Sequence, residues 1–246
     1  MTVRLLGLDF ADLDAPAAAA LIAQQSAGAS FRYVVTPNAD HLVRLARHPE
    51  LGTAYEGAWL RLLDSRVVAR AARLLGLAVP RVAPGSDLTA LLMSAHLQPA
   101  ERVTIIGLRP SWLPALIRRY RLAEVAHHDP PMGFDCDAAA FRSAIDFVVK
   151  HPARFTFLAV GSPRQELLAA AIAATGQAQG VGLCIGASLE FLSSTTQRAP
   201  MWMQRRGLEW LHRMASDPRR LARRYLVQDP VVFGLLFREW RRMRAG

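Results

Sequence analysis

The chain has 246 residues, 52% of them hydrophobic, and a formal net charge of +10 at pH 7. This composition indicates a soluble, globular protein with one substantial core, and it disfavours two equal domains. The charge is uneven: residues 198–246 hold twelve arginines against four acidic residues and carry +8, whereas the rest of the chain carries only +2.

Some protein classes are disfavoured by what the sequence lacks. Cys136 and Cys184 are far apart and belong to no C-x-x-C pair, which disfavours a disulfide framework or a thiolate metal site and favours a reducing cytosol. The first residues, MTVRLLGLDFADLDAP, carry acids where a signal peptide needs a longer apolar stretch. The nearest candidate for a membrane span, VVFGLLF at 231–237, is far shorter than the ~20 residues required.

Helix-like and strand-like segments alternate along the chain. In order, we expect a helix at 14–24, a strand at 31–35, a helix at 41–58, a strand at 59–64, a helix at 86–97, a strand at 102–107, helices at 111–122 and 137–150, a strand at 154–161, a helix at 164–175 and a strand at 181–186. This alternation predicts an α/β fold with a mostly parallel sheet and helices on its faces.

A binding cleft is expected beyond the carboxyl ends of these strands, where ligands of parallel sheets bind. The turns TPNAD, DSR, GLRP, GSPRQE and GAS each follow an expected strand, so they fall on the same rim. The residues expected to line the cleft are Thr36, Asn38, Asp40, Asp64, Gly107, Gly161, Ser162, Gln165 and Glu166.

Each of these turns also has an ordinary structural explanation. The GSPRQE turn could receive an anion on backbone N–H groups, yet Ser162 as an N-cap followed by Pro163 is the more frequent explanation. Thr36 or Asn38 could simply cap the next helix. Asp64 ends an apolar strand, which suits a general base, but a surface pairing with Arg66 or Arg70 is about equally plausible.

No obligatory metal site is expected. The D-x-D pattern at 135–137 resembles a metal-binding motif, but Asp135 or Asp137 as a cap for the following helix is the favoured interpretation. His127 and His128 are adjacent, and adjacent strand residues point to opposite faces, which is poor geometry for a shared ion.

The basic tail combines arginines with apolar and aromatic residues at helical spacing, and Pro218 and Pro230 divide it into short helices. We rank a helix lying on an anionic membrane surface first, a helix packed on the body second and a nucleic-acid-binding arm third. Nucleic acid gives no reason for so much aliphatic surface.

Several stretches, taken in order, resemble one known family. They are VVTPNADHLVRL, LLDSRVVARAARLLG, PGSDL, VTIIGLRP, AVGSPRQE, QRAP and GLEWLHRMASDPRRLARRYL. Together they are similar to the WecG/TagA/CpsF glycosyltransferases, glycosyltransferase family 26, over nearly the whole chain. The resemblance implies a Rossmann-like body at residues 1–196, with helices on both sheet faces, and a basic helical C-terminal appendage at 197–246.

The resemblance further implies an inverting, metal-independent transfer of a sugar from a UDP-sugar to a polyprenyl-diphosphate-linked acceptor, for a bacterial surface polysaccharide or wall polymer. No cofactor is expected. The protein would lie on the inner face of the cytoplasmic membrane, in contact with anionic lipid. Exposed apolar faces also leave a homo-oligomer open.

Roles carry over by motif. Asp64 matches the proposed catalytic base, Thr36 and Asn38 the acceptor-side turn, and Gln165 the glutamine of the family's P-K-Q-E turn. The nucleotide-sugar candidates are Gly107, Phe134, Gly161, Ser162, Arg164, Glu166 and Glu190. The candidates for the acceptor diphosphate or the membrane are Arg198, Arg213, Arg220, Arg223, Arg224 and Trp240.

The chain departs from the family pattern at three places: Ser65 replaces a glycine after the base, Arg164 replaces a lysine, and Glu190 stands where an aspartate is common. Serine in place of glycine restricts that turn, and the longer Glu190 is expected to alter the preference for nucleotide or sugar. The donor is therefore less defined than the reaction class. Two alternatives remain: an inactive family member acting as a scaffold, and a nucleic-acid-binding protein whose activity would not depend on Asp64.

Overall fold

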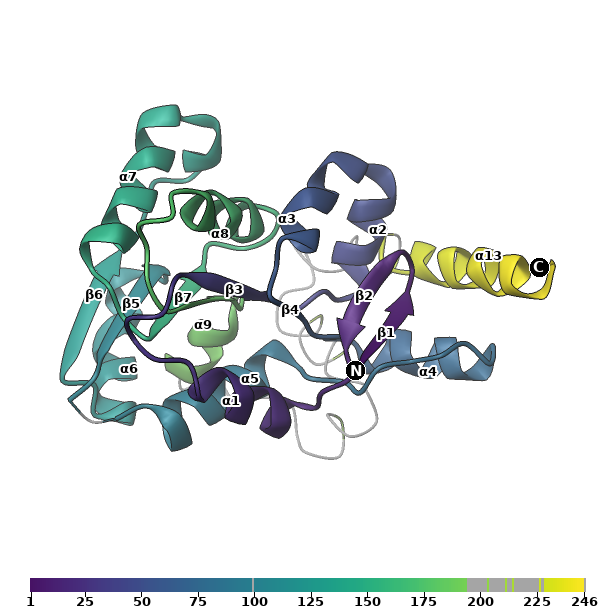
Figure 1. Ribbon diagram of the computed structural model, residues 1–246, viewed down its shortest axis with the longest axis horizontal. Coiled ribbons are helices and arrows are strands. Elements are labelled where there is room, and N and C mark those ends of the chain that lie inside the picture. Colours follow the sequence, from purple (N-terminus) through teal and green to yellow (C-terminus); the bar gives the residue numbers. More distant parts are fainter. Residues whose placement is uncertain are drawn as a thin grey trace.

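The computed structural model describes residues 1–98, 100–193 and 228–245, together with positions 203, 211, 214 and 226. In this part of the chain, a six-stranded sheet has the order β4-β3-β8-β7-β5-β6 and a two-stranded hairpin joins β1 to β2 (Figure 1). The strands are β1 (Thr2–Leu5), β2 (Leu8–Ala11), β3 (Arg32–Val35), β4 (Leu60–Arg61), β5 (Arg102–Gly107), β6 (Glu124–His128), β7 (Phe155–Ala159) and β8 (Val181–Cys184). Every pairing in the larger sheet is parallel, which confirms the expected α/β fold.

Helices cover both faces of the sheet (Figure 1). The described helices are α1 (Ala15–Ala23), α2 (Ala39–Arg47), α3 (Gly52–Glu56), α4 (Arg66–Leu74), α5 (Gly85–Leu91), α6 (Leu113–Tyr120), α7 (Ala138–Lys150), α8 (Arg164–Ala174), α9 (Ser188–Ser193) and α13 (Val231–Ala245). Helices α1, α5, α6 and α9 pack on one face, and α2, α3, α7 and α8 pack on the other. The sheet is therefore buried on both sides, as parallel sheets require.

Neighbouring strand residues divide between the two cores. The α1-side core lies between the sheet and helices α1, α5, α6 and α9, and the α8-side core lies between the sheet and helices α2, α3, α7 and α8. Val34 and Ile105 belong to the α1-side core, and Val35 and Ile106 belong to the α8-side core. Because side chains alternate across a strand, a sheet buried on both faces needs a continuous apolar run rather than an alternating one. This requirement explains why the central strands stood out in the sequence.

Some elements differ from expectation. The expected helix at 41–58 is broken after α2, because Pro49 begins a separate 3-10 turn (η1, Pro49–Leu51) before α3. The expected strand at 59–64 is ordered as β4 only over Leu60–Arg61. Strand β6 was not expected, because it is an edge strand of only partly buried residues that includes two histidines.

The β1–β2 hairpin was also not expected, since its turn has an unusual composition. Leu6 and Gly7 form the two-residue turn, and both have positive φ angles, 50° and 83°. Two-residue hairpin turns favour this conformation because it matches the twist of the strands, but Asn or Gly usually occupies the first position. Leucine there gives no hairpin signal in the sequence.

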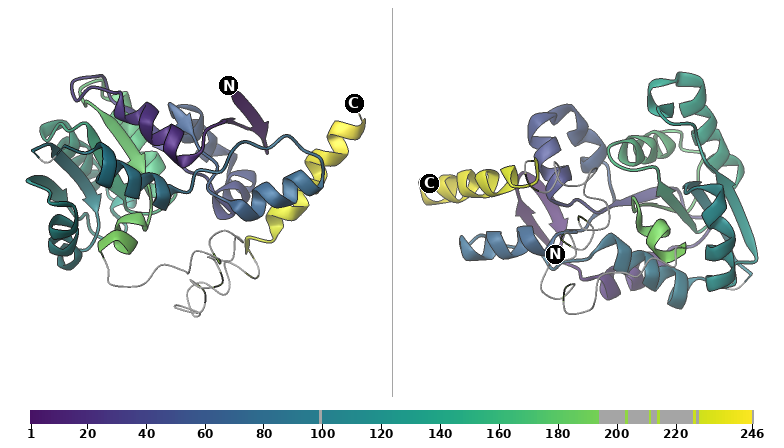
Figure 2. Two further views of the ribbon diagram at one scale, coloured as in Figure 1. Left: turned by 90° about the horizontal axis from the view of Figure 1, so that it is seen from below. Right: turned by 180° about the vertical axis from the view of Figure 1, so that it is seen from behind.

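Helix α13 packs on the body beside α4 and α2 (Figure 2). Val232 and Leu236 are 1% and 0% exposed within the α8-side core, and Glu239 Oε2 accepts a hydrogen bond from Leu6 N–H at 2.7 Å. The packed-helix alternative is therefore confirmed for one face of α13. In the part of the chain that the structure describes, no helix is long and apolar enough to cross a bilayer.

Candidate functional site

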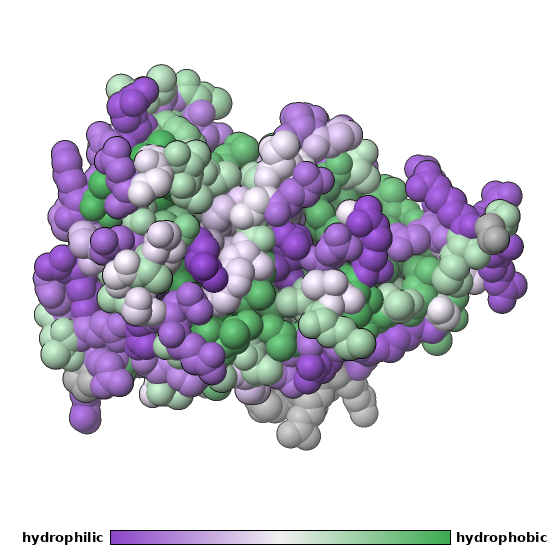
Figure 3. All heavy atoms as spheres, viewed as in Figure 1, coloured by the Kyte–Doolittle hydropathy of each residue, from purple (hydrophilic) through white to green (hydrophobic). Residues whose placement is uncertain are grey.

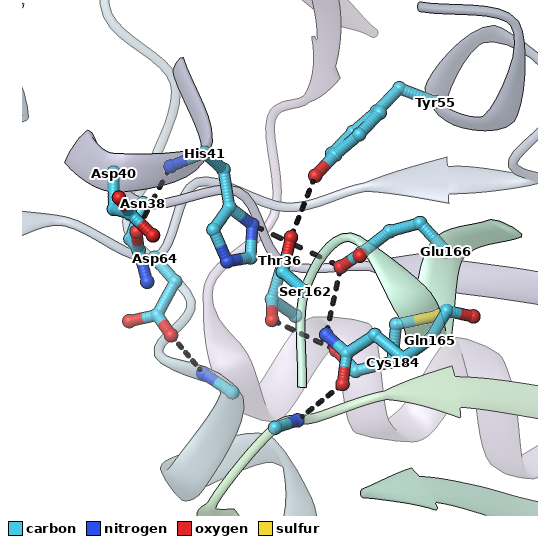
Figure 4. A network of polar contacts seen from close by, with 12 residues as sticks. Thr36, Asn38, Asp40, His41, Tyr55, Asp64, Ser162, Gln165, Glu166 and Cys184 are labelled. Carbon is cyan, nitrogen blue, oxygen red and sulfur yellow. Dashed lines mark hydrogen bonds and ion pairs between the residues drawn. The ribbon is translucent and has the colours of Figure 1, made fainter. Parts of the chain in front are cut away.

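Two of the expected polar turns meet at the start of α5 (Figure 4). Thr36 follows β3, and its hydroxyl donates to the Cys184 carbonyl at the end of β8 at 3.2 Å. Asp64 follows β4, and its Oδ2 accepts the Gly85 N–H at 3.1 Å. A Cβ on Gly85 would lie 3.0 Å from Thr36 Oγ1 and 3.4 Å from Asp64 Oδ2, so the absence of a side chain allows the three segments to converge.

Asp64 is held in a defined orientation at this meeting point. Its side chain is partly buried, and the Gly85 N–H fixes one carboxylate oxygen. Arg66, one of the two suggested surface partners, has its guanidinium 4.0 Å from Asp87. A carboxylate that is oriented by a backbone N–H and lies beside a threonine hydroxyl suits general-base chemistry on a hydroxyl group.

Asn38 and its neighbours tie α2 to the rim. Asn38 caps α2, since its Oδ1 accepts the His41 N–H at 3.4 Å, and this confirms the capping interpretation for Asn38. One turn later, Arg44 donates to Asp40 at 2.7 Å and to the Ser162 hydroxyl at 2.9 Å. Helix α2 is thereby joined to the turn between β7 and α8.

The turn between β7 and α8 differs from the expected cap. Helix α8 begins at Arg164, its N-cap is Pro163, and the Ser162–Pro163 peptide is cis. Ser162 as N-cap was wrong: its hydroxyl is instead engaged by Arg44, and it lies 3.4 Å from Tyr55 Oη. Gly161 adopts φ of 80°, which only glycine adopts readily.

Gln165 links this turn to the end of β8. It is 2% exposed, its Oε1 accepts the Gly186 N–H at 2.8 Å, and its Nε2 donates to Glu166 Oε1 at 2.8 Å. Glu166 is fully buried, and desolvation raises the pKa of its carboxyl above the ordinary range for glutamate. Its carboxyl therefore lies beneath the rim rather than on it.

The family model for the glycosyl transferase WecG/TagA/CpsF family matches residues 3–246. The chain belongs to this family. The expected resemblance is confirmed over nearly the whole chain, including the segments outside the described residues. The family suggests a sugar donor and an acceptor as substrates. Because ligands of parallel sheets bind beyond the carboxyl ends of the strands, we expect both substrates to bind at this rim.

Other site candidates of this glycosyltransferase lie at varied depths. Gly107, with φ of 85°, ends β5 so close to β7 that a Cβ would lie 2.9 Å from the Ala159 carbonyl oxygen. His127 Nε2 lies 2.9 Å from the carbonyls of Gly107 and Leu108. Both partners are acceptors, so Nε2 carries the proton and fixes the loop that follows β5.

Three further nucleotide-sugar candidates differ in burial: Phe134 is buried, and Arg164 and Glu190 are partly exposed. Phe134 is 2% exposed and stacks on Phe141, so its ring belongs to the core under α7 rather than to an open surface. Arg164 donates to the Met132 sulfur at 3.2 Å, which joins the α8 start to the loop before Phe134. Glu190 lies in α9, on the other side of the sheet from α8.

The D-x-D segment of this glycosyltransferase caps a helix. Asp137 Oδ1 accepts the N–H groups of Ala139 and Ala140 at 2.9 and 3.1 Å, which confirms the favoured interpretation. Among the described residues, no group of three or more His, Cys, Asp or Glu side chains is arranged to hold a metal ion. Metal independence itself stays a prediction.

The acceptor-side candidates Arg198, Arg213, Arg220, Arg223 and Arg224 lie outside the described residues. Trp240 is described: it is half-buried, stacks on Phe237 at 5.2 Å between ring centroids, and is covered by the Arg244 guanidinium at 4.7 Å. Sequence reasoning did not single out His41, Arg44, Tyr55 or Gly85 as site residues. Only the PGSDL stretch, which includes Gly85, carried a signal, and that signal came from the resemblance.

Proposed function

We propose that the protein transfers a sugar from a UDP-sugar to a polyprenyl-diphosphate-linked acceptor. The transfer inverts the anomeric carbon and needs no metal. It serves the synthesis of a bacterial surface polysaccharide or wall polymer. The observation that carries the proposal is the convergence of Asp64, Thr36 and Gly85 on one rim of a WecG/TagA/CpsF glycosyltransferase. The sugar, the acceptor glycan and the linkage are left to experiment.

The proposed reaction is a single displacement at the rim. The acceptor hydroxyl oxygen attacks the anomeric carbon, its proton passes to the Asp64 carboxylate, and the bond from the anomeric carbon to the UDP oxygen breaks. UDP then leaves with the bonding electron pair. We assign the partly exposed Arg164 and the backbone N–H groups of Gly161, Ser162 and Arg164 as donors for the leaving diphosphate.

The acceptor side of the proposal is supported by charge and by exposed apolar residues. A hollow beside α4 is lined by Asp14, Arg66, Ala69, Arg70, Arg73, Arg81 and Val82, an excess of three positive charges. Arginine binds phosphate oxygens in forked geometry. The exposed large apolar residues nearby are Leu74, Val231, Phe233, Phe237 and Met243.

Helices α4 and α13 project from the same end of the molecule (Figure 2). Figure 3 shows hydrophobic and hydrophilic residues interleaved along α13. Apolar side chains with a basic rim are typical of a surface that rests on an anionic bilayer, which is where a polyprenyl-linked acceptor resides. We therefore include a peripheral position on the inner face of the cytoplasmic membrane in the proposal.

The proposal is tested by UDP release from a panel of UDP-sugars, with a short-chain polyprenyl-diphosphate-sugar acceptor and EDTA present. We expect release that requires both the acceptor and one particular donor. Binding of UDP without turnover on any donor would favour the scaffold alternative. Absence of UDP binding in calorimetry would contradict the proposed donor class.

A further inference from the structure

Glu166 is an acid without an obvious chemical role at the rim. It is fully buried, and Figure 4 shows it among His41 from α2, Tyr55 from α3, Cys184 from β8 and Ser162 from the preceding turn. Arg44 from α2 and Tyr33 from β3 also interact with it electrostatically. Burying a carboxyl group costs free energy unless its hydrogen bonds compensate. A carboxyl group that is buried at the proposed active site is therefore a candidate for a role in positioning its neighbours.

The contacts of Gln165 indicate that role. Its side-chain amide has one acceptor end and one donor end, and each end meets a complementary partner: Oε1 accepts from Gly186 N–H and Nε2 donates to Glu166 Oε1, both at 2.8 Å. If the amide rotated by half a turn, its N–H groups would face the Gly186 N–H and its oxygen would face the Glu166 oxygen. Both contacts would be repulsive, so Glu166 and Gly186 together select one orientation of the amide.

Glu166 also borders α2. His41 Nδ1 lies 3.9 Å from Glu166 Oε1, and the His41 ring is 7% exposed between Glu166 and Tyr55. The His41 backbone N–H is the donor that Asn38 caps. One carboxyl therefore hydrogen-bonds to the Gln165 side chain and lies next to the first turn of α2, which Asn38 caps.

We propose that Glu166 is a positioning residue for the transferase site: its carboxyl fixes the orientation of the Gln165 amide and holds the β7–α8 turn against the first turn of α2. This inference rests on the function proposed above, because that function makes the site catalytic. The contacts of Glu166 themselves do not depend on the donor or the acceptor. Sequence analysis expected Glu166 to bind the nucleotide-sugar; because its carboxyl is fully buried, we place its action through Gln165 instead.

The protonation state of Glu166 makes the inference testable by pH. Burial raises the pKa of its carboxyl, against smaller opposing effects of the Gln165 and Ser162 hydrogen bonds and the Arg44 charge. A protonated carboxyl has one acceptor oxygen and one O–H donor, and a glutamine amide has the same two functions. Glutamine at position 166 should therefore reproduce the neutral acid, whereas alanine removes both functions.

We expect Glu166→Ala to lower kcat/KM on the order of 10- to 100-fold through misplacement of Gln165, and Glu166→Gln to restore most of the activity. Glu101→Gln is the matched control, because it removes a largely buried carboxylate paired with Arg154 just before β5, at the sheet edge opposite the rim.

The stability of the fold gives a second readout. The pKa of Glu166 is raised in the folded protein, so above the ordinary glutamate pKa of about 4.3 the unfolded chain loses this proton first. The contribution of Glu166 to stability therefore falls as pH rises toward the folded-state pKa. Melting temperatures across this range should fall less with pH in Glu166→Gln than in the wild type.

Hydrogen exchange at the Gly186 amide separates this inference from the proposed function, because it needs no substrate. Exchange should quicken in Glu166→Ala and stay slow in Glu166→Gln. If exchange and activity in Glu166→Ala match the wild type, or if Glu166→Gln is as impaired as Glu166→Ala while folded, the inference is overturned. A wild type that is inactive on every donor but shows the expected exchange pattern would contradict only the proposed function.

Discussion

Gly85 is the residue on which the geometry of the rim depends most closely. Its N–H donates to Asp64. A Cβ added at Gly85 would lie 3.0 Å from Thr36 Oγ1 and 3.4 Å from Asp64 Oδ2. We expect Gly85→Ala to displace one of these two groups and to lower kcat/KM roughly 10- to 100-fold. The melting temperature should also fall, because Gly85 and Thr36 are buried and the added methyl group overpacks this site.

Gly28→Ala is the control for this prediction. A Cβ at Gly28 would meet nothing within 4 Å, so both activity and melting temperature should match the wild type. Steady-state kinetics on the two alanine variants decides the matter. Equal activity in Gly85→Ala and Gly28→Ala would show that the close approach at Gly85 does not shape the site.

Local contacts explain which individual residues could be assigned from sequence. Asn38 and Asp137 cap the helices that they precede, and a cap depends only on the next few residues. Ser162 was assigned wrongly because its partners, Arg44 and Tyr55, come from segments more than one hundred residues away in the chain. No local pattern reports such contacts. The approach of Glu166 to His41 and the hydrogen bond of Gln165 to Gly186 could not be predicted for the same reason.

At the scale of elements, α13 has two faces with different expected effects. Leu236 is fully buried against the core, whereas the adjacent Phe237 is 48% exposed. We expect Leu236→Ala to lower the free energy of unfolding by about 2–5 kcal/mol through the cavity that it leaves. Denaturant unfolding, followed by circular dichroism, measures this loss.

Phe237→Ala is the matched variant on the exposed face. It should change stability much less, yet weaken sedimentation with vesicles that contain anionic phospholipid, because a side chain that inserts into the interface is lost. Unchanged vesicle binding in Phe237→Ala would contradict the membrane role of this face. Unchanged stability in Leu236→Ala would contradict its packing.

Elements were predictable where one periodicity dominated. The central strands β5, β7 and β8 are mostly apolar, and α7 and α8 are long helices, so each was expected within a few residues. Edge elements were not: β6 is only partly buried, and the β1–β2 turn places Leu6 at a positive φ. Both owe their conformation to tertiary contacts that a single sequence does not display.

At the scale of the whole molecule, the common rim was predictable because all parallel strands end on the same edge. The order β4-β3-β8-β7-β5-β6 was not, since it depends on crossovers that no local pattern records. The same limit applies to the division at residues 196 and 197, which stays a prediction. Helix α13 shares the α8-side core, so the end of the expected appendage is not separate from the body.

We propose that the rim around Asp64 carries out the sugar transfer. The most direct test is Asp64→Asn, assayed for acceptor-dependent UDP release in EDTA with the donor that the wild type uses. Asp135→Asn serves as control, because Asp135 lies in the short 3-10 turn η4 (Phe134–Cys136) before α7. We predict that Asp64→Asn binds UDP and melts like the wild type but loses turnover by several orders of magnitude. Turnover of Asp64→Asn close to that of the wild type would show that Asp64 is not the catalytic base.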